Sequence, residues 1–115
     1  MRKMSNQIKL SQSLTKTREK KIESYLKKRA EALGFMCIKF TSPSNDGVPD
    51  RVVIGHGHVF FVALKAPGEN LRKLQEYVVK EFKKFGADVY VVDTKEKVDE
   101  VLSLYCSDND EILKN

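Results

Sequence analysis

The segment DRVVIGHGHVFFVALK, residues 50–65, predicts a β-hairpin with one acidic and one basic side chain at its open end. Two apolar runs flank GHGH, which is a turn signal. If the turn is centred on His56 and Gly57, residues whose numbers sum to 56 + 57 = 113 face each other across the two strands. Asp50 then lies opposite Ala63, with Cβ atoms roughly 4.5–5.5 Å apart. Lys65 lies two residues further along, on the same face of its strand.

The composition predicts one soluble globular domain. The chain has 115 residues, of which 41% are hydrophobic and 32% are charged, and this length suffices for a single core. No apolar run approaches the roughly 18 residues that cross a bilayer, and residues 1–7 lack the apolar core of a signal peptide. We therefore expect a cytoplasmic protein.

The net charge is +5, from 21 basic and 16 acidic residues. This excess suits a polyanionic partner without demanding one. Each basic cluster falls in a predicted helix, so a solvated helix face is the simpler interpretation of any one of them. The clusters are Lys20-Lys21, Lys27-Lys28-Arg29, Arg72-Lys73 and Lys83-Lys84.

The cysteines and histidines do not indicate a metal site. Cys37 and Cys106 have no metal-ligand spacing. Cys37 lies in an apolar run, which predicts a core residue, and a disulfide is not expected in a reducing cytosol. His56 and His58 alternate with glycine, which favours a role in the turn.

Hydrophobic periodicity predicts the remaining elements around the hairpin. We expect a helix over 18–33, ended by Gly34, then a strand over 35–40 and a loop over 41–49. A second helix over 71–85 leads to a strand over 88–92, parallel to the strand before that helix. Asp93 and Glu96 have capping-box spacing at the start of a last helix that reaches Tyr105.

The fold class is therefore α/β, in the order α-β-β-β-α-β-α, with a mixed four-stranded sheet flanked by helices. Both faces of the hairpin are apolar, which predicts that the sheet is covered on both faces. Residues 1–17 are polar and are interpreted as a flexible arm, 18–106 as the domain, and 107–115 as an acidic tail that frays.

Asp50 and Lys65 are charged residues in apolar surroundings. A lone carboxylate there is costly unless it is paired or binds a cation. An ion pair between the two and an active site therefore remain equally good interpretations of these two residues alone.

A wider set of motifs resembles the VRR-NUC branch of the PD-(D/E)xK nucleases. The defining motifs are GVPDR, residues 47–51, and ALKAPG, residues 63–68. The resemblance runs from about Glu19 to Leu102 and includes IESYL at 22–26, KFTSP at 39–43 and LQ at 74–75. It implies a restriction-endonuclease-like core. In the family the position of Ala63 carries glutamate or, less often, aspartate, so this chain departs from the pattern there.

The resemblance implies a site that binds Mg²⁺ or Mn²⁺ through Asp50, the missing acid at position 63 and the main-chain carbonyl of Leu64. A glutamate of the first helix would assist; its spacing favours Glu23, with Glu19 as the alternative. Lys65 would position the attacking water. Gln75 would line the site, although a solvated edge residue is nearly as good an interpretation. We expect DNA contacts from Lys39, Ser42, Ser44, Arg51, Arg72 and Lys73.

The resemblance predicts a structure-selective DNA endonuclease of bacteria or their viruses, similar to the stand-alone Holliday-junction resolvases. Two symmetric cuts need two sites, which implies a homodimer. A monomer that acts on flaps or forks, as the domain does inside larger repair nucleases, is the alternative. We interpret Ala63 as the inactivating replacement of a catalytic glutamate. A natural relative that binds branched DNA without cutting remains open, as does an unrelated small α/β protein.

Overall fold

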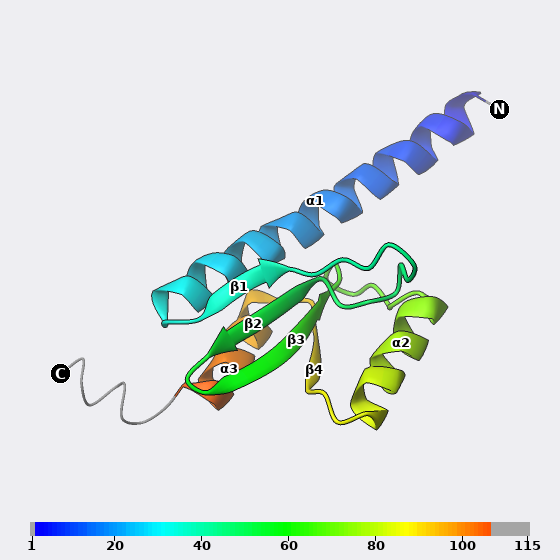
Figure 1. The fold of residues 1–115 in the computed structure, drawn as a ribbon. Coiled ribbons are helices and arrows are strands. Elements are labelled where there is room, and N and C mark those ends of the chain that lie inside the picture. Colours follow the sequence, from blue (N-terminus) through cyan, green and yellow to red (C-terminus); the bar gives the residue numbers. More distant parts are fainter. Residues whose placement is uncertain (1, 107–115) are drawn as a thin grey trace.

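The computed structural model describes the backbone of residues 2–106 and the side chains from Thr17 onward. The elements are α1 (Arg2–Ala32), β1 (Met36–Lys39), β2 (Arg51–Gly55), β3 (His58–Leu64), α2 (Lys73–Lys84), β4 (Val89–Val92) and α3 (Lys95–Tyr105). The strands form one sheet in the order β1-β2-β3-β4 (Figure 1). The first three strands are antiparallel and β4 is parallel to β3. The predicted element order and mixed sheet are confirmed.

The hairpin has the predicted register. Arg51 pairs with Val62 and Val52 with Phe61, so the numbers of facing residues sum to 113. His56 and Gly57 have φ angles of 53° and 82°, the left-handed conformations that a two-residue hairpin turn requires. The His56 Nε2 atom lies 2.8 Å from the carbonyl oxygen of Leu33. His56 therefore shapes the turn, as predicted.

One face of the sheet forms the main core with α1 and α3. Its strand residues, which are almost fully buried, are Val53, Phe60, Val62, Leu64 and Val92. They pack against Ile22, Leu26 and Ala30 of α1 and Val98 and Leu102 of α3. Cys37 is buried there as a free thiol, which confirms its predicted core position.

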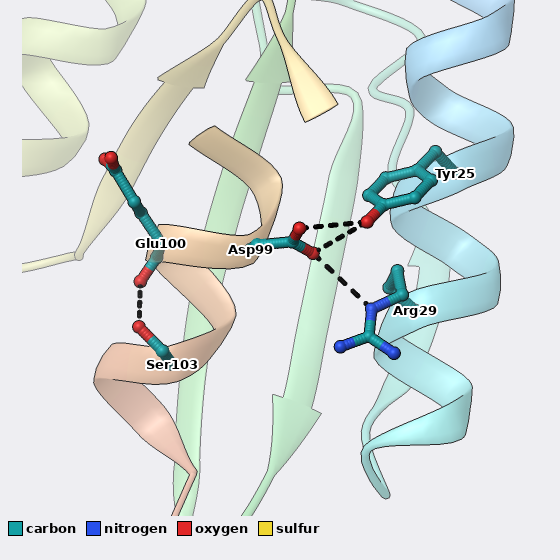
Figure 2. A network of polar contacts seen from close by, with 5 residues as sticks. All are labelled: Tyr25, Arg29, Asp99, Glu100 and Ser103. Atoms are coloured by element: carbon teal, nitrogen blue, oxygen red, sulfur yellow. Dashed lines mark hydrogen bonds and ion pairs between the residues drawn. The ribbon is translucent and has the colours of Figure 1, made fainter. Parts of the chain in front are cut away.

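Polar contacts also join the two helices behind the sheet. Asp99 of α3 accepts two hydrogen bonds from the Tyr25 hydroxyl, each 2.9 Å long, and lies 3.4 Å from Arg29 Nε (Figure 2). The hydrogen bond to Asp99 is the main cause of the raised pKa of Tyr25. These contacts fix α1, and the acids that it carries, relative to the rest of the fold.

The other face is covered only in part, so the prediction of a sheet covered on both faces is wrong. Helix α2 packs over Ala63, Val89 and Phe61, but Ile54 and Val59 remain 38% and 55% exposed. The reason is topological: α2 connects β3 to β4 and lies over that half of the sheet, while α1 and α3 both lie on the opposite face (Figure 1).

Two helix starts differ from the predictions. Helix α1 begins at Arg2 instead of residue 18, because residues 2–17 contain no glycine or proline to stop it. The flexibility of this arm stays a prediction, and the predicted tail, 107–115, lies outside the described residues. Helix α3 is capped by Thr94, whose side chain accepts from the Lys97 amide at 3.1 Å. The predicted box of Asp93 and Glu96 is therefore wrong. No helix within residues 2–106 has the length and apolarity of a membrane span.

Candidate active site

Asp50 lies directly before β2, at the open end of the hairpin. Its Oδ2 atom accepts a hydrogen bond of 2.7 Å from the main-chain amide of Leu64. Burial is the main influence on Asp50 and raises the pKa of its carboxyl group; the Leu64 bond opposes this shift. The GVPD turn thus holds a partly desolvated acid against the end of β3, where a cation would restore favourable interactions.

Ala63 shares the sheet face of Asp50 but contributes no polar atom. Its side chain is 2% exposed and packs with Val79 of α2 and Val89 of β4. Because facing residues in the hairpin sum to 113, position 63 lies across from Asp50, as the sequence predicted. An acidic side chain at this position would have Asp50 as its cross-strand neighbour.

Lys65 follows β3 at the same end of the sheet. Its Nζ atom lies 4.0 Å from Asp93 Oδ2, and the other oxygen of Asp93 lies 3.0 Å from Lys97 Nζ. These cations, Lys97 foremost, lower the pKa of Asp93. The ion pairs of residues 17–106 do not include the Asp50–Lys65 pair that the sequence left open. The ion pair of Lys65 is with Asp93, a partner that the sequence did not indicate.

The two glutamates of α1 are in different surroundings. Glu23 accepts a hydrogen bond of 2.8 Å from Arg51 Nε in a largely buried ion pair. Glu19 is half-buried, and its pKa is raised first by burial and next by the charge of Asp50, with Arg72 opposing the rise. Glu23 is therefore committed to Arg51, whereas Glu19 lies within the electrostatic influence of Asp50.

Arg51 is not available as the DNA contact that the sequence predicted. Its residue is only 8% exposed, and its guanidinium is occupied by Glu23 and, at 3.4 Å, by the carbonyl oxygen of Cys37. The alternation of β2 explains the error, because Asp50 and Arg51 point to opposite faces of the sheet. Arg51 acts as a buried structural cation.

A polar cavity of about 280 Å³ adjoins Asp50. Its lining includes two of the predicted DNA contacts, Lys39 and Ser42, together with Glu23. The other predicted contacts are exposed: Ser44 lies on the neighbouring loop, and Arg72 and Lys73 lie at the start of α2. Reasoning from the sequence missed the remaining polar lining residues, Thr41, Asn45 and Asp46. The loop signal over 41–49 located this segment without indicating which of its side chains face inward.

Comparisons with known proteins agree with this geometry. No family model matches the chain. A protein of Acyrthosiphon pisum secondary endosymbiont phage 1, named "Putative nuclease p44", is 37% identical over 83 residues, which cover 69% of this chain and 86% of that protein. A solved structure described as "VRR_NUC domain" is 32% identical, with a TM-score of 0.70, and the match covers 76% of this chain and 97% of that one. The chain belongs to the VRR-NUC family.

Gln75 lies near this VRR-NUC site but already has a structural contact. Its Oε1 atom accepts a hydrogen bond of 2.9 Å from the Arg72 amide and so caps the first turn of α2. The residue is half-buried. This position is compatible with both predictions, a lining residue and a partly solvated edge residue, because the amide nitrogen of Gln75 is not used in the cap.

The residues present do not form a complete VRR-NUC metal site. A hard divalent cation needs several oxygen ligands, and residues 17–106 contain no group of three or more His, Cys, Asp or Glu side chains arranged to hold one. Asp50 supplies a carboxylate, and position 63 supplies none because it is alanine. An acid at position 63 is the change that would bring a second carboxylate to Asp50.

Proposed function

We propose that this chain has the site of a divalent-metal-dependent, structure-selective DNA endonuclease, impaired because alanine occupies position 63. The observation that carries the proposal is the meeting of Asp50, position 63 and Lys65 at one end of the β2–β3 hairpin in a VRR-NUC fold. Hydrolysis of a phosphodiester needs charge neutralisation at the phosphate and an activated water. Asp50 and Lys65 are suited to these tasks.

Mg²⁺ or Mn²⁺ is the cofactor that we propose. With an acid restored at position 63, its ligands would be that acid, Asp50 and the carbonyl of Leu64, with Glu19 or Glu23 assisting. The bound metal would polarise the scissile phosphate and lower the pKa of a bound water. Lys65 would hold that water and offset the charge that develops on the phosphate.

The proposed substrate is branched DNA, as in a Holliday-junction resolvase. The support is indirect: a net charge of +5 and a polar cavity beside Asp50 lined by Lys39 and Ser42. Cations and hydroxyl groups at such a site contact phosphates, which positions a nucleic acid without reading its sequence. Symmetric cleavage of a junction would require a homodimer; a monomeric flap or fork nuclease is the alternative.

The decisive experiment compares this chain with its Ala63→Glu and Ala63→Gln variants on labelled four-way junction, flap and linear duplex, with Mg²⁺ or Mn²⁺. Glutamine matches the size of glutamate but lacks its charge. We expect Ala63→Glu alone to cleave, with a preference for branched DNA. Adding Asp50→Asn should then abolish cleavage. If Ala63→Glu binds metal and DNA but leaves every substrate intact, the nuclease proposal is wrong.

A second function, a branched-DNA-binding module that does not cut, is favoured by one observation. Ala63 is packed among Val79 and Val89, so the space for a second acid is occupied by an apolar cluster. This alternative predicts tight, salt-sensitive junction binding by this chain and by Ala63→Glu, with no cleavage by either. The assay above separates the two functions.

A further inference from the structure

A contiguous apolar surface covers the half of the sheet that α2 leaves uncovered. Its four exposed residues are Met36, Ile38, Ile54 and Val59, at 57%, 45%, 38% and 55% exposure; we call this surface the open face. Met36 pairs with Ile54, and Ile54 pairs with Val59. The three therefore form a row across β1, β2 and β3, on the side of the sheet away from α1 and α3 (Figure 1).

The open face carries no charged side chain on its three strands. The charged or titratable residues of these strands, Lys39, Arg51 and His58, alternate with the open-face residues and point to the other side of the sheet. Scattered exposed apolar residues are ordinary, but a continuous apolar strip on a sheet marks an interaction site. Phosphates bind cations and polar groups, so DNA is not a suitable partner for this surface.

We propose that the open face is the surface through which two copies of this chain pair, an inference that rests on the proposed two-cut function. A two-fold axis places the same patch on both partners, and an apolar patch complements itself without charge matching. Two such sheets would pack face to face about 10 Å apart, with their strands inclined by roughly 30°.

The size of the open face predicts that neighbouring surface joins the contact. Three strands spaced by about 4.8 Å and four residues at about 3.3 Å give a flat footprint of roughly 14 by 13 Å. A standard interface buries about 800 Å² on each partner. Helix α2 borders the strip, since Phe82 contacts both Phe40 and Phe61. Its exposed apolar side chains, Leu74 and Tyr77, can extend the contact. We therefore expect a concentration-dependent dimer.

The proposed pairing places the two active sites at the ends of the interface. Asp50 precedes Ile54 by four residues on β2, about 13 Å along the strand, and both side chains lie on the face that the dimer would use. A two-fold axis through the open face would put the two Asp50 residues on opposite sides, separated by roughly twice that distance. One bound junction could then meet both sites.

The test measures the mass of this chain in solution, by light scattering or sedimentation over micromolar to millimolar concentrations, beside two variants. Val59→Lys places a charge on the open face. Leu104→Lys places the same charge on α3, at an apolar residue that is 66% exposed. Both should fold, as checked by circular dichroism. We expect the parent and Leu104→Lys to dimerise and Val59→Lys to be monomeric. A monomeric parent, or a dimer that survives Val59→Lys, overturns the inference.

A second measurement separates this inference from the proposed function. The Ala63→Glu protein, with and without Val59→Lys, is given a plasmid carrying a cruciform, and linear products (two cuts) are counted against nicked products (one cut). Loss of linear product with nicking retained supports pairing through the open face. If Ala63→Glu makes paired cuts as a monomer, the inference fails while the nuclease function stands. A dimer broken by Val59→Lys but inert on all DNA supports the interface and contradicts the nuclease.

Discussion

Asp50 and Glu19 are acids that the fold holds in an unfavourable environment. Both are partly buried, both have a raised pKa, and the charge of Asp50 adds to the rise at Glu19. Structural carboxylates are normally paired so that their charged form is favoured. Two neighbouring acids with the opposite shift are typical of a site that waits for a cation or a proton. Glu23, in its ion pair with Arg51, is the contrasting structural case.

Replacing Asp50 with asparagine should make the metal-free protein more stable at neutral pH. A carboxyl group whose pKa is raised on folding binds its proton more tightly in the folded state, so stability falls as the pH rises from the unfolded pKa through the folded one. Asp50→Asn removes this loss, and its amide oxygen can still accept the Leu64 hydrogen bond. Urea unfolding between pH 4 and 8 should show the gain growing with pH, roughly over the range above the ordinary Asp pKa of about 3.9.

An asparagine variant that is less stable than the parent at pH 7 and gains nothing relative to it as the pH rises would contradict this prediction. Ser44→Ala, which changes an exposed polar residue on the neighbouring loop, is a control that should show no such pH dependence.

The two helix acids should respond oppositely to neutralisation. Glu23→Gln leaves the Arg51 guanidinium buried without its counter-charge, which should cost about 3 kcal/mol of unfolding free energy. Glu19→Gln removes a disfavoured charge beside Asp50 and should cost nothing or stabilise the metal-free protein. Denaturant unfolding of both variants at pH 7 compares them directly. Equal losses would mean that Glu19 also has a structural role.

At the level of elements, the sequence predicts well what local chemistry determines. The hairpin register follows from His56 and Gly57, whose left-handed conformations leave one way to pair the strands. The start of α3 was placed one residue early because Asp93 and Thr94 are both good caps. The ion pairs of Asp93 with Lys65 and Lys97 come from different elements, so sequence spacing gave no warning of them.

The exposed half of the sheet shows a second limit. Apolar residues on both faces of a strand predict burial on both faces, but they do not say whether a helix or another molecule covers each face. The coverage depends on where α2 lies, which the 3.6-residue pattern of that helix does not fix. Likewise, the position of Asp50 opposite Ala63 was predictable, whereas the burial of Arg51 required the α1 partner Glu23.

Gly47 sets how closely the GVPD loop approaches α2. A Cβ atom built on it would lie 2.8 Å from Val78 Cγ2 and 2.9 Å from the carbonyl oxygen of Leu74. Gly47→Ala should therefore push the loop and α2 apart and cost about 1–3 kcal/mol, as overpacking does. Thermal unfolding measures the loss, and Ser44→Ala on the same loop is the matched control. An alanine at position 47 that leaves the melting temperature unchanged would show that the contact yields easily.

At the scale of the molecule, catalytic residues and fold stability meet at position 63. The Asp50 carboxylate is already partly desolvated, and Ala63 fills the adjoining apolar space with Val79 and Val89. A second carboxylate there would add a like charge to a poorly solvated site. The complete nuclease site should therefore be less stable than this chain until a cation binds.

The Ala63→Glu variant should accordingly melt below the parent in the absence of metal, by about 2 kcal/mol or more in unfolding free energy, the usual cost of burying an unpaired charge. Mn²⁺ or Mg²⁺ should reverse the loss, since a ligand at 100 times its Kd stabilises the folded state by about 2.7 kcal/mol. Ala63→Gln has the same bulk without the charge and should show no metal response. The readout is the melting temperature with EDTA and with metal. If the metal raises the melting temperatures of parent, Gln and Glu forms equally, the cation binds elsewhere, and Asp50 and position 63 do not share it.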